Sequence, residues 1–151
     1  MSDISAAEKA IDRMEIEDLA RRYAHGIDAR DWERVDSCFS PTAAVRGTTF
    51  SGPYPEYMSS LRGAVESYRT TMHFFGNQLT EVTADTGHCV TYGIAYHLGS
   101  GAGRDFVIGV RYRDDVVRSG GQWLISARVV EGVWRQPLGA DVVELSAPLE
   151  S

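Results

Sequence analysis

Apolar residues recur at three- and four-residue steps in the first part of the chain, which is the pattern of an amphipathic helix. This stripe predicts a helix over residues 6–27. Its members are Ile16, Leu19, Ala20, Tyr23 and Ile27. Asp31 is a residue type that caps helix N-termini, so a second, short helix is expected from there through Phe39. Ser40 and Pro41 would end it, because proline disfavours helical geometry in the residue before it.

The pattern is weaker over the segment that follows. Residues 43–46 can form a brief strand, and the glycine and prolines within 51–55 indicate a turn. Apolar residues then return to helical spacing and predict a third helix over 57–68. Three helices are therefore expected before the chain changes its periodicity.

From residue 71 onward the hydrophobic period becomes two, which is the period of β-strands. Segments rich in Val, Ile, Thr and aromatic residues predict four long strands, over 72–84, 88–98, 104–117 and 122–135. Glycine-containing connectors separate these segments, as in β-hairpins. Helices followed by an antiparallel meander predict an α+β fold in which the helices pack on one face of the sheet.

The predicted strands are longer than the usual ~5–6 residues. A sheet of such strands must twist and curl. When three short helices close one face of a curled sheet, the result is a cone whose interior side chains need not fill. We therefore expect a cavity between the helices and the sheet, and the candidate chemistry is sought there.

The chain has 151 residues, the size of a single domain, with 43% hydrophobic and 24% charged residues as in globular proteins. We assign residues 1–135 to this domain. The segment 136–151 is weakly patterned and is treated as a C-terminal tail, which is expected to be disordered or to lie across a partner subunit.

Fifteen Lys and Arg residues stand against 21 Asp and Glu, and no basic cluster is visible, so nucleic-acid binding is not expected. No apolar run approaches the ~20 residues of a membrane helix. Cys38 and Cys89 have no metal-like spacing, which favours a reduced, cytoplasmic protein. The motifs of phosphate-binding loops, nucleophile elbows and metal-binding helices are absent from the sequence. Cofactor-free acid/base catalysis and simple binding remain.

His73 is the first candidate for such catalysis, near the start of the first long strand. Alternation places His73, Phe75, Asn77 and Leu79 on one face, a mixture that suits a semi-polar pocket. A single histidine in a strand is more often structural than catalytic. Its role therefore depends on whether a carboxylate reaches it.

Asp28 follows the apolar stripe of the first helix. A carboxylate at a helix C-terminus faces the negative end of the helix dipole, which is unfavourable unless a partner or a function compensates. An aspartate that only caps the turn together with Arg30 and Asp31 explains the local sequence equally well.

Arg128 and Tyr23 are further candidates. In the last strand, alternation predicts one wholly apolar face and puts Arg128 on the other, either toward solvent or as a fixed cation in the cavity. Tyr23 belongs to the apolar stripe, and the sequence allows two roles for it: a residue of the packed core or a residue with a catalytic hydroxyl. The side chains expected to contact a ring-containing, largely apolar substrate are Phe75, Asn77, Tyr92 and Tyr57.

Several segments together resemble the SnoaL-like branch of the NTF2-like superfamily, and the resemblance spans roughly residues 14–133. The segments are Arg22-Tyr23-Ala24-His25-Gly26-Ile27-Asp28, Asp31-Trp32-Glu33-Arg34-Val35, Met72-His73-Phe74-Phe75-Gly76-Asn77 and Gly121-Gln122-Trp123-Leu124-Ile125-Ser126. In that superfamily, scytalone dehydratase, bile-acid 7α-dehydratase and hexachlorocyclohexane dehydrochlorinase eliminate water or HCl without a cofactor. They use a His–Asp pair inside a cone of three N-terminal helices and a curved, mostly antiparallel sheet.

By this resemblance Asp28 and His73 correspond to the catalytic pair, Tyr23 to a catalytic tyrosine and Arg128 to an arginine of the pocket. The dehydrochlorinase has a lysine where this chain has Tyr23, and the second catalytic histidine of scytalone dehydratase has no assigned counterpart.

The resemblance implies a cofactor-free lyase of the dehydratase type that acts on a small molecule, and it implies a homodimer or homotrimer. An isomerase or polyketide cyclase that uses the same pair is one alternative. A non-catalytic module that binds a small molecule is another.

Overall fold

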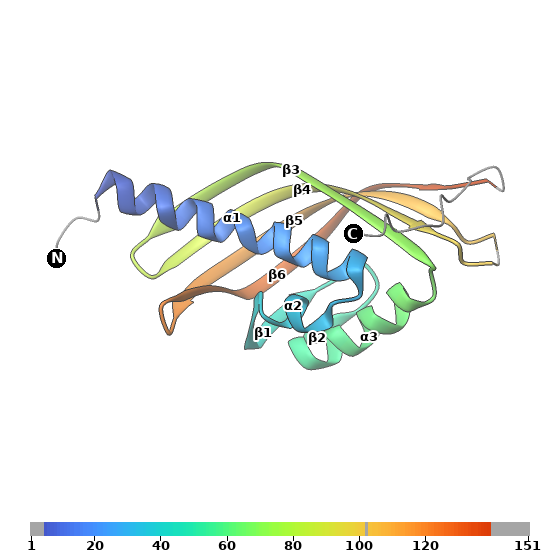
Figure 1. Ribbon diagram of the computed structural model, residues 1–151, viewed down its shortest axis with the longest axis horizontal. Coiled ribbons are helices and arrows are strands. Elements are labelled where there is room, and N and C mark those ends of the chain that lie inside the picture. Colours follow the sequence, from blue (N-terminus) through green and yellow to red (C-terminus); the bar gives the residue numbers. More distant parts are fainter. Residues whose placement is uncertain (1–4, 102, 140–151) are drawn as a thin grey trace, which may run out of the picture.

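Three helices cover the concave face of one strongly curved, six-stranded sheet in the computed structural model, which describes residues 5–101 and 103–139 (Figure 1). The helices are α1 (Ala6–Ala29), α2 (Trp32–Asp36) and α3 (Tyr54–Glu66). The strands are β1 (Phe39–Arg46), β2 (Ser51–Pro53), β3 (Thr70–Thr83), β4 (Thr86–Leu98), β5 (Phe106–Ser119) and β6 (Gln122–Pro137). The sheet order is β2-β1-β6-β5-β4-β3, in which β1 and β6 are parallel and all other neighbours are antiparallel. The α+β cone predicted from the sequence is confirmed.

The two ends of α1 are fixed by local chemistry. Ser5 and Glu8 form a capping box, in which each side chain bonds the backbone N–H of the other residue. At the C-terminus Arg30 takes a left-handed conformation with φ 59°, and its N–H bonds the last carbonyls of the helix. The sharp exit turns the chain at once into the short helix α2, where Asp31 caps the backbone N–H of Arg34 as predicted.

The prediction that α2 continues through Phe39 is wrong. The helix ends at Asp36, and Phe39 is the first residue of β1, where it pairs with Ile125 of β6. Pairing with a long central strand outweighs the weak propensity of a single extra turn. The predicted turn at 51–55 likewise contains the short strand β2, and α3 starts earlier than predicted, at Tyr54.

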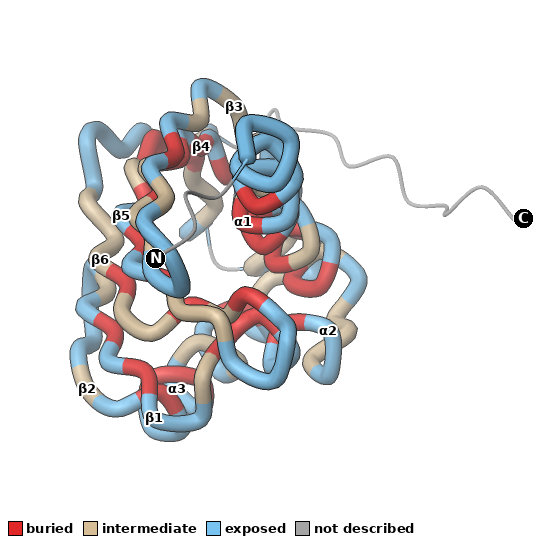
Figure 2. The backbone as a smooth tube through the Cα atoms, turned by 90° about the vertical axis from the view of Figure 1, so that its left-hand side faces the viewer, coloured by how far each residue is buried: buried red, intermediate tan, exposed pale blue. Residues whose placement is uncertain are grey.

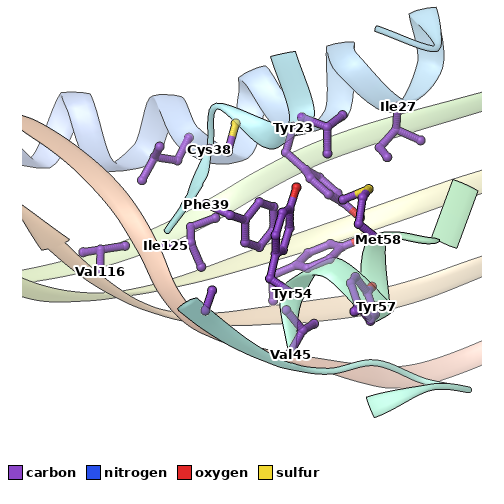
Figure 3. Packing of buried hydrophobic residues seen from close by; sticks show 14 of the residues in the cluster. Tyr23, Ile27, Cys38, Phe39, Val45, Tyr54, Tyr57, Met58, Val116 and Ile125 are labelled. Carbon is purple, nitrogen blue, oxygen red and sulfur yellow. The ribbon is translucent and has the colours of Figure 1, made fainter. Parts of the chain in front are cut away.

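Buried residues occur on the helices and on the strands, as the red segments of the backbone in Figure 2 show. Tyr23 reaches from α1 toward a cluster that includes Phe39, Tyr54 and Met58 (Figure 3). Cys38 and Cys89 are both buried free thiols. In the part of the chain that the structure describes, no helix is both long and apolar enough to cross a membrane.

In the described part of the sheet, three β-bulges interrupt the alternation of side chains where antiparallel strands pair. One lies in β3 between Gly76 and Leu79, and two lie in β6, at Ser126 and at Val133. Each extra residue moves the side chains beyond it to the opposite face of the sheet. The predicted apolar face of β6 is therefore wrong beyond Ile125: the bulge at Ser126 turns Arg128 toward the helices.

Arg128 is held there by a buried ion pair. Its guanidinium bonds both carboxylate oxygens of Asp114, from Nε at 2.7 Å and from Nη2 at 2.8 Å. The two residues are 1% and 3% exposed, and the cation lies 4.4 Å from the ring centre of Tyr23 and 4.5 Å from that of Tyr112. Burial disfavours the charge, but Asp114 more than compensates, so the pKa of Arg128 lies above its ordinary value.

The outer face of the sheet carries several large apolar side chains that are exposed in the single chain: Met72, Phe74, Leu79, Tyr92, Ile94, Tyr96, Val133 and Trp134. A contiguous apolar face of this kind is typical of protein–protein contact. The homodimer or homotrimer implied by the resemblance stays a prediction, and this face is where it would form.

Removal of the Asp114 carboxylate should strongly destabilise the fold. The Asp114→Ala variant leaves the Arg128 cation buried without a counter-charge, which costs about 3–5 kcal/mol in comparable cases. Urea denaturation followed by circular dichroism measures the loss. The Asp114→Leu/Arg128→Met double variant removes both charges and should recover most of the stability. An Asp114→Ala variant as stable as the unaltered chain would contradict this account of the pair.

Candidate functional site

A cavity of about 550 Å³ lies between α1, α3 and the inner face of the sheet. This volume is within the range of small-molecule sites. Its buried end is formed by the three tyrosines Tyr23, Tyr57 and Tyr112, and two histidines, His73 and His97, stand in its wall. The remaining lining is mostly apolar and includes Ile27, Leu61, Ala64, Val65, Ala95, Phe106, Ile108, Val110 and Val130.

The carboxylate of Asp28 reaches His73 from the end of α1. His73 Nδ1 lies 2.7 Å from Asp28 Oδ1, and the backbone N–H of His73 donates to Asp28 Oδ2 at 2.8 Å. Because an ionised carboxylate only accepts hydrogen bonds, Nδ1 must carry the proton. In the neutral imidazole the other ring nitrogen, Nε2, is then the hydrogen-bond acceptor, on a side chain that lines the cavity.

A third hydrogen bond to Asp28 comes from the hydroxyl of Thr71, which donates to Oδ1 at 3.0 Å. Burial raises the pKa of the Asp28 carboxyl. The hydrogen bonds and charge of His73 and the Thr71 hydroxyl outweigh burial, so the pKa lies below its ordinary value. Asp28 therefore stays ionised at neutral pH and keeps His73 oriented.

Arg30 fixes the position of Thr71 in turn. Its Nη1 donates to the Thr71 hydroxyl at 2.7 Å and to the carbonyl of Ile27, and its Nη2 donates to the carbonyls of Val65 and Tyr68. One side chain thus joins the end of α1, the end of α3 and the start of β3. These bonds give the Asp28–His73 pair a rigid support beyond its own contact.

Tyr23, Tyr57 and Tyr112, which form the buried end of the cavity, share one electrostatic environment. Burial raises the pKa of Tyr23, Tyr57 and Tyr112 above that of an exposed phenol, and the nearby Arg128 charge offsets only part of this rise. All three phenols are therefore protonated at neutral pH and can donate hydrogen bonds. Tyr23 is 2% exposed and its ring lies edge-on to His73, with ring centres 6.5 Å apart.

His97 is a site residue that the sequence analysis did not assign. Its ring centre is 5.9 Å from that of His73, and it stacks on Phe106 at 4.3 Å. Burial, reinforced by the charge of His73, lowers the pKa of His97 to about 4. The register of the β3–β4 hairpin, in which His97 pairs with Thr71, could have placed it beside the start of β3. That register depends on the bulge at Gly76, which the sequence alone did not reveal.

The structure places His73, Tyr23 and Tyr57 in the lining of the cavity and Asp28 in contact with His73, but it does not place all predicted contact residues in the cavity. Phe75 lies beside His73 and packs over Gly93, where a Cβ atom would come within 2.7 Å of its ring. It supports the wall and is not among the lining residues.

Asn77 and Tyr92 are corrections to the prediction. Both line a separate groove of about 340 Å³ on the outer face of the sheet. Asn77 has φ 47° within the β3 bulge, which breaks the alternation that should have placed it beside His73. Tyr92 is directed outward with its ring under the guanidinium of Arg111, at 5.5 Å.

Arg128 also has a different position from the one expected. It is directed inward, but Tyr23 and Tyr112 lie over it and it does not line the cavity. It can act on a substrate only through these rings. Across residues 5–101 and 103–139, no group of three His, Cys, Asp or Glu side chains is arranged to hold a metal ion.

Comparison with known sequences matches the SnoaL-like domain model to residues 8–129. Uncharacterized protein Rv2910c of Mycobacterium tuberculosis is 29% identical over 132 residues, which are 85% of this chain and 89% of that protein. Uncharacterized protein AN9274 of Emericella nidulans is 30% identical over 83 residues, which cover 54% of this chain and 34% of that protein.

Solved structures with the same fold include two kinds of named enzyme. The crystal structure of LinA has a TM-score of 0.83 at 21% identity and covers 96% of this chain and 99% of its own. The hexachlorocyclohexane dehydrochlorinase LinA-type3 from Novosphingobium barchaimii scores 0.82 at 20% identity, covering 95% and 100%. A putative scytalone dehydratase from Novosphingobium aromaticivorans scores 0.77 at 19% identity, covering 93% and 97%. At these identities the likeness shows the fold.

The stability of the protein should fall as the pH drops from 6.5 toward 4. In that window the unfolded chain protonates His97 and the folded chain does not, so stability present above pH 6.5 is lost on acidification. The loss is at most ~1.4 kcal/mol per pH unit for one group. His97→Gln should flatten the profile of unfolding free energy against pH, measured by urea denaturation.

His25 provides the matched control, since it is an exposed histidine on the outer side of α1. The His25→Gln variant should keep the profile of the unaltered chain. A His97→Gln profile as steep as that of the unaltered chain would show that His97 does not titrate as argued.

Proposed function

Since the chain belongs to the SnoaL-like domain family, we propose that it is a cofactor-independent lyase that eliminates water from a ring-containing, largely apolar small molecule. The observation that carries this proposal is the 2.7 Å contact between His73 Nδ1 and Asp28 Oδ1 in the wall of a cavity of about 550 Å³. The dehydratase and dehydrochlorinase names of the structures that share this fold support the same reaction class.

His73 is the general base of the proposed reaction. An imidazole whose unperturbed pKa is ~6.5 accepts a proton readily near neutral pH. Asp28 holds the Nδ1–H tautomer and stabilises the imidazolium that forms when Nε2 takes a proton. The carboxylate is itself fixed by Thr71 and by the backbone of His73, so the base needs little rearrangement to react.

In the proposed elimination, His73 first accepts a proton from the substrate and then returns it to the leaving group. Nε2 removes the proton from a carbon next to a carbonyl group, and the electron pair of that C–H bond passes through the enolate into the new C=C bond. The C–O bond to the β-hydroxyl breaks, and the leaving hydroxide takes the proton from the His73 imidazolium and departs as water. The products are an unsaturated carbonyl compound, one water molecule and the unchanged enzyme.

The tyrosine hydroxyls stabilise the enolate. The carbonyl oxygen gains negative charge when the C–H proton leaves, and protonated phenols in a buried pocket can bond it strongly. Tyr23 is the best placed because it lines the cavity beside His73. The Arg128 cation under its ring further favours negative charge at this end of the cavity. Arg128 is therefore a positioning and electrostatic residue in this proposal and does not contact the leaving group.

His73→Ala and Asp28→Asn should each abolish most of the activity, by roughly 10²–10⁴-fold in kcat/KM, because they remove the base or its orientation. The assay is a panel of ring-bearing β-hydroxy ketones, followed by enone absorbance and by loss of one water in product mass. Hexachlorocyclohexane, followed by chloride release, tests elimination of a halide.

His25→Ala is the matched control and should keep full activity, because His25 is exposed on the far side of α1. Turnover that survives both site variants would exclude the proposed base. A product of unchanged mass would indicate an isomerase or cyclase, and substrates recovered unchanged from the whole panel would indicate a binding module.

Tyr23→Phe should lower kcat by roughly 10²-fold, the typical cost of one hydrogen-bond donor to a developing oxyanion. The variant keeps the ring over Arg128, so its thermal unfolding should change little. Tyr54→Phe is a suitable comparison, since the Tyr54 hydroxyl donates to Asp36 away from the cavity and its loss should leave kcat unchanged. Equal kcat in Tyr23→Phe and the unaltered chain would exclude the phenol from catalysis.

A further inference from the structure

Arg135 stands at the open end of the cavity, on the same inner face of the sheet as His73. In the register of the sheet, His73 pairs with Ala95, Ala95 with Ile108, and Ile108 with Arg135, so the four residues form one row across β3, β4, β5 and β6. The second bulge of β6, at Val133, directs Arg135 inward and leaves Trp134 on the outer face, over Gly109. Arg135 is exposed and still lines the cavity.

The guanidinium of Arg135 is held over an aromatic ring and not by an acid. It lies 4.0 Å from the ring centre of Phe106, which itself stacks on His97. Within the described residues no ion pair or hydrogen bond joins its side chain to a carboxylate. Two acids near Arg135 in the chain or across the sheet are engaged elsewhere. Glu131 of the same strand pairs with Arg111 and Arg113, and Asp105, just before β5, accepts the backbone N–H groups of Gly99 and Ser100.

The opening of the cavity at Arg135 has a positive charge, whereas the chain as a whole is negatively charged. The chain has a net charge of −6, yet no Asp or Glu is found among the described residues that line the cavity. Asp28 does not line the cavity: its carboxylate accepts hydrogen bonds from His73 and Thr71. A planar guanidinium with unused donors, fixed on a ring beside an apolar cavity, is suited to bind a carboxylate through two parallel hydrogen bonds.

We propose that the cavity takes carboxylate-bearing substrates: Arg135 binds the carboxylate at the mouth, and the apolar ring body lies inside with its reacting carbon at His73. The placement of the reacting carbon at His73 rests on the proposed function; the binding of a carboxylate by Arg135 does not. Three strand spacings separate residues 73 and 135 along the row, so their backbones are roughly 14 Å apart. The reach of the two side chains shortens that span, and the carboxylate must therefore lie several bonds from the reacting carbon.

The test is a binding measurement that needs no turnover. The probes are 4-(2-naphthyl)butanoate and its neutral amide, which share one ring body and differ only in charge at the distal end. Isothermal titration should show that the unaltered chain binds the acid about tenfold more tightly than the amide. Higher salt should reduce this preference, since the ion pair is near solvent.

Arg135→Gln should remove the preference while the affinity for the amide stays unchanged, and Arg135→Lys should keep part of it. Arg13→Gln, which removes an exposed arginine from α1, should keep all of it. Equal affinity for acid and amide in the unaltered chain, a preference that survives Arg135→Gln, or no binding of either probe would each overturn the inference.

The two proposals can fail separately. His73→Ala should keep the preference for the acid, because the carboxylate contacts only the mouth. A preference that depends on Arg135 in a chain without elimination activity would support the anion site and refute the lyase. Elimination activity that depends on His73, with no preference for the acid, would refute the anion site and leave the lyase intact.

Discussion

The Asp28 carboxylate is the point on which the site depends. It receives the ring nitrogen and the backbone N–H of His73 and the hydroxyl of Thr71, and so joins the last turn of the long helix to the edge strand of the sheet. A carboxylate at a helix C-terminus is unfavourable against the helix dipole. Three hydrogen bonds offset that cost, and Arg30 adds a cation beside them. The same bonds that make the residue tolerable in the fold also orient the imidazole that it touches.

A second constraint operates beneath the cavity, where the Arg128–Asp114 pair is enclosed by aromatic rings. A buried ion pair is seldom worth more in stability than an apolar packing of the same volume. Its position gives it another use, because the cation lies under Tyr23 and Tyr112 and makes that end of the cavity favourable to negative charge. The fold thus keeps a positive charge close to the cavity without exposing it to the cavity or to water.

Periodicity was sufficient to predict three helices and the rough extent of the four long strands, because an apolar stripe and period-two alternation extend over many residues. It did not predict the short strand β2 or the end of α2 at Asp36. It located Asp28 and His73 in the chain, and the family resemblance supplied their contact. Periodicity did not predict the face of the sheet on which Asn77 and Arg128 lie, because that face depends on single-residue bulges. A bulge leaves no clear mark in one sequence, yet it moves every later side chain to the other face. His97 was missed for the same reason, since its neighbours follow from register and not from its own segment.

The two bulges of β6 also decide which charges enter the cavity. A regular strand that starts with Trp123 and Ile125 inward would direct Glu131 inward and leave Arg128 outside. The bulge at Ser126 reverses this, so that Arg128 enters the interior and Glu131 joins Arg111 and Arg113 outside. The bulge at Val133 reverses it again and returns Arg135 to the inner face. Two extra residues thus exclude a carboxylate from the chamber and place one cation behind its tyrosines and another at its mouth. The irregularities of the strand, more than its regular part, fix the charge that a substrate would meet.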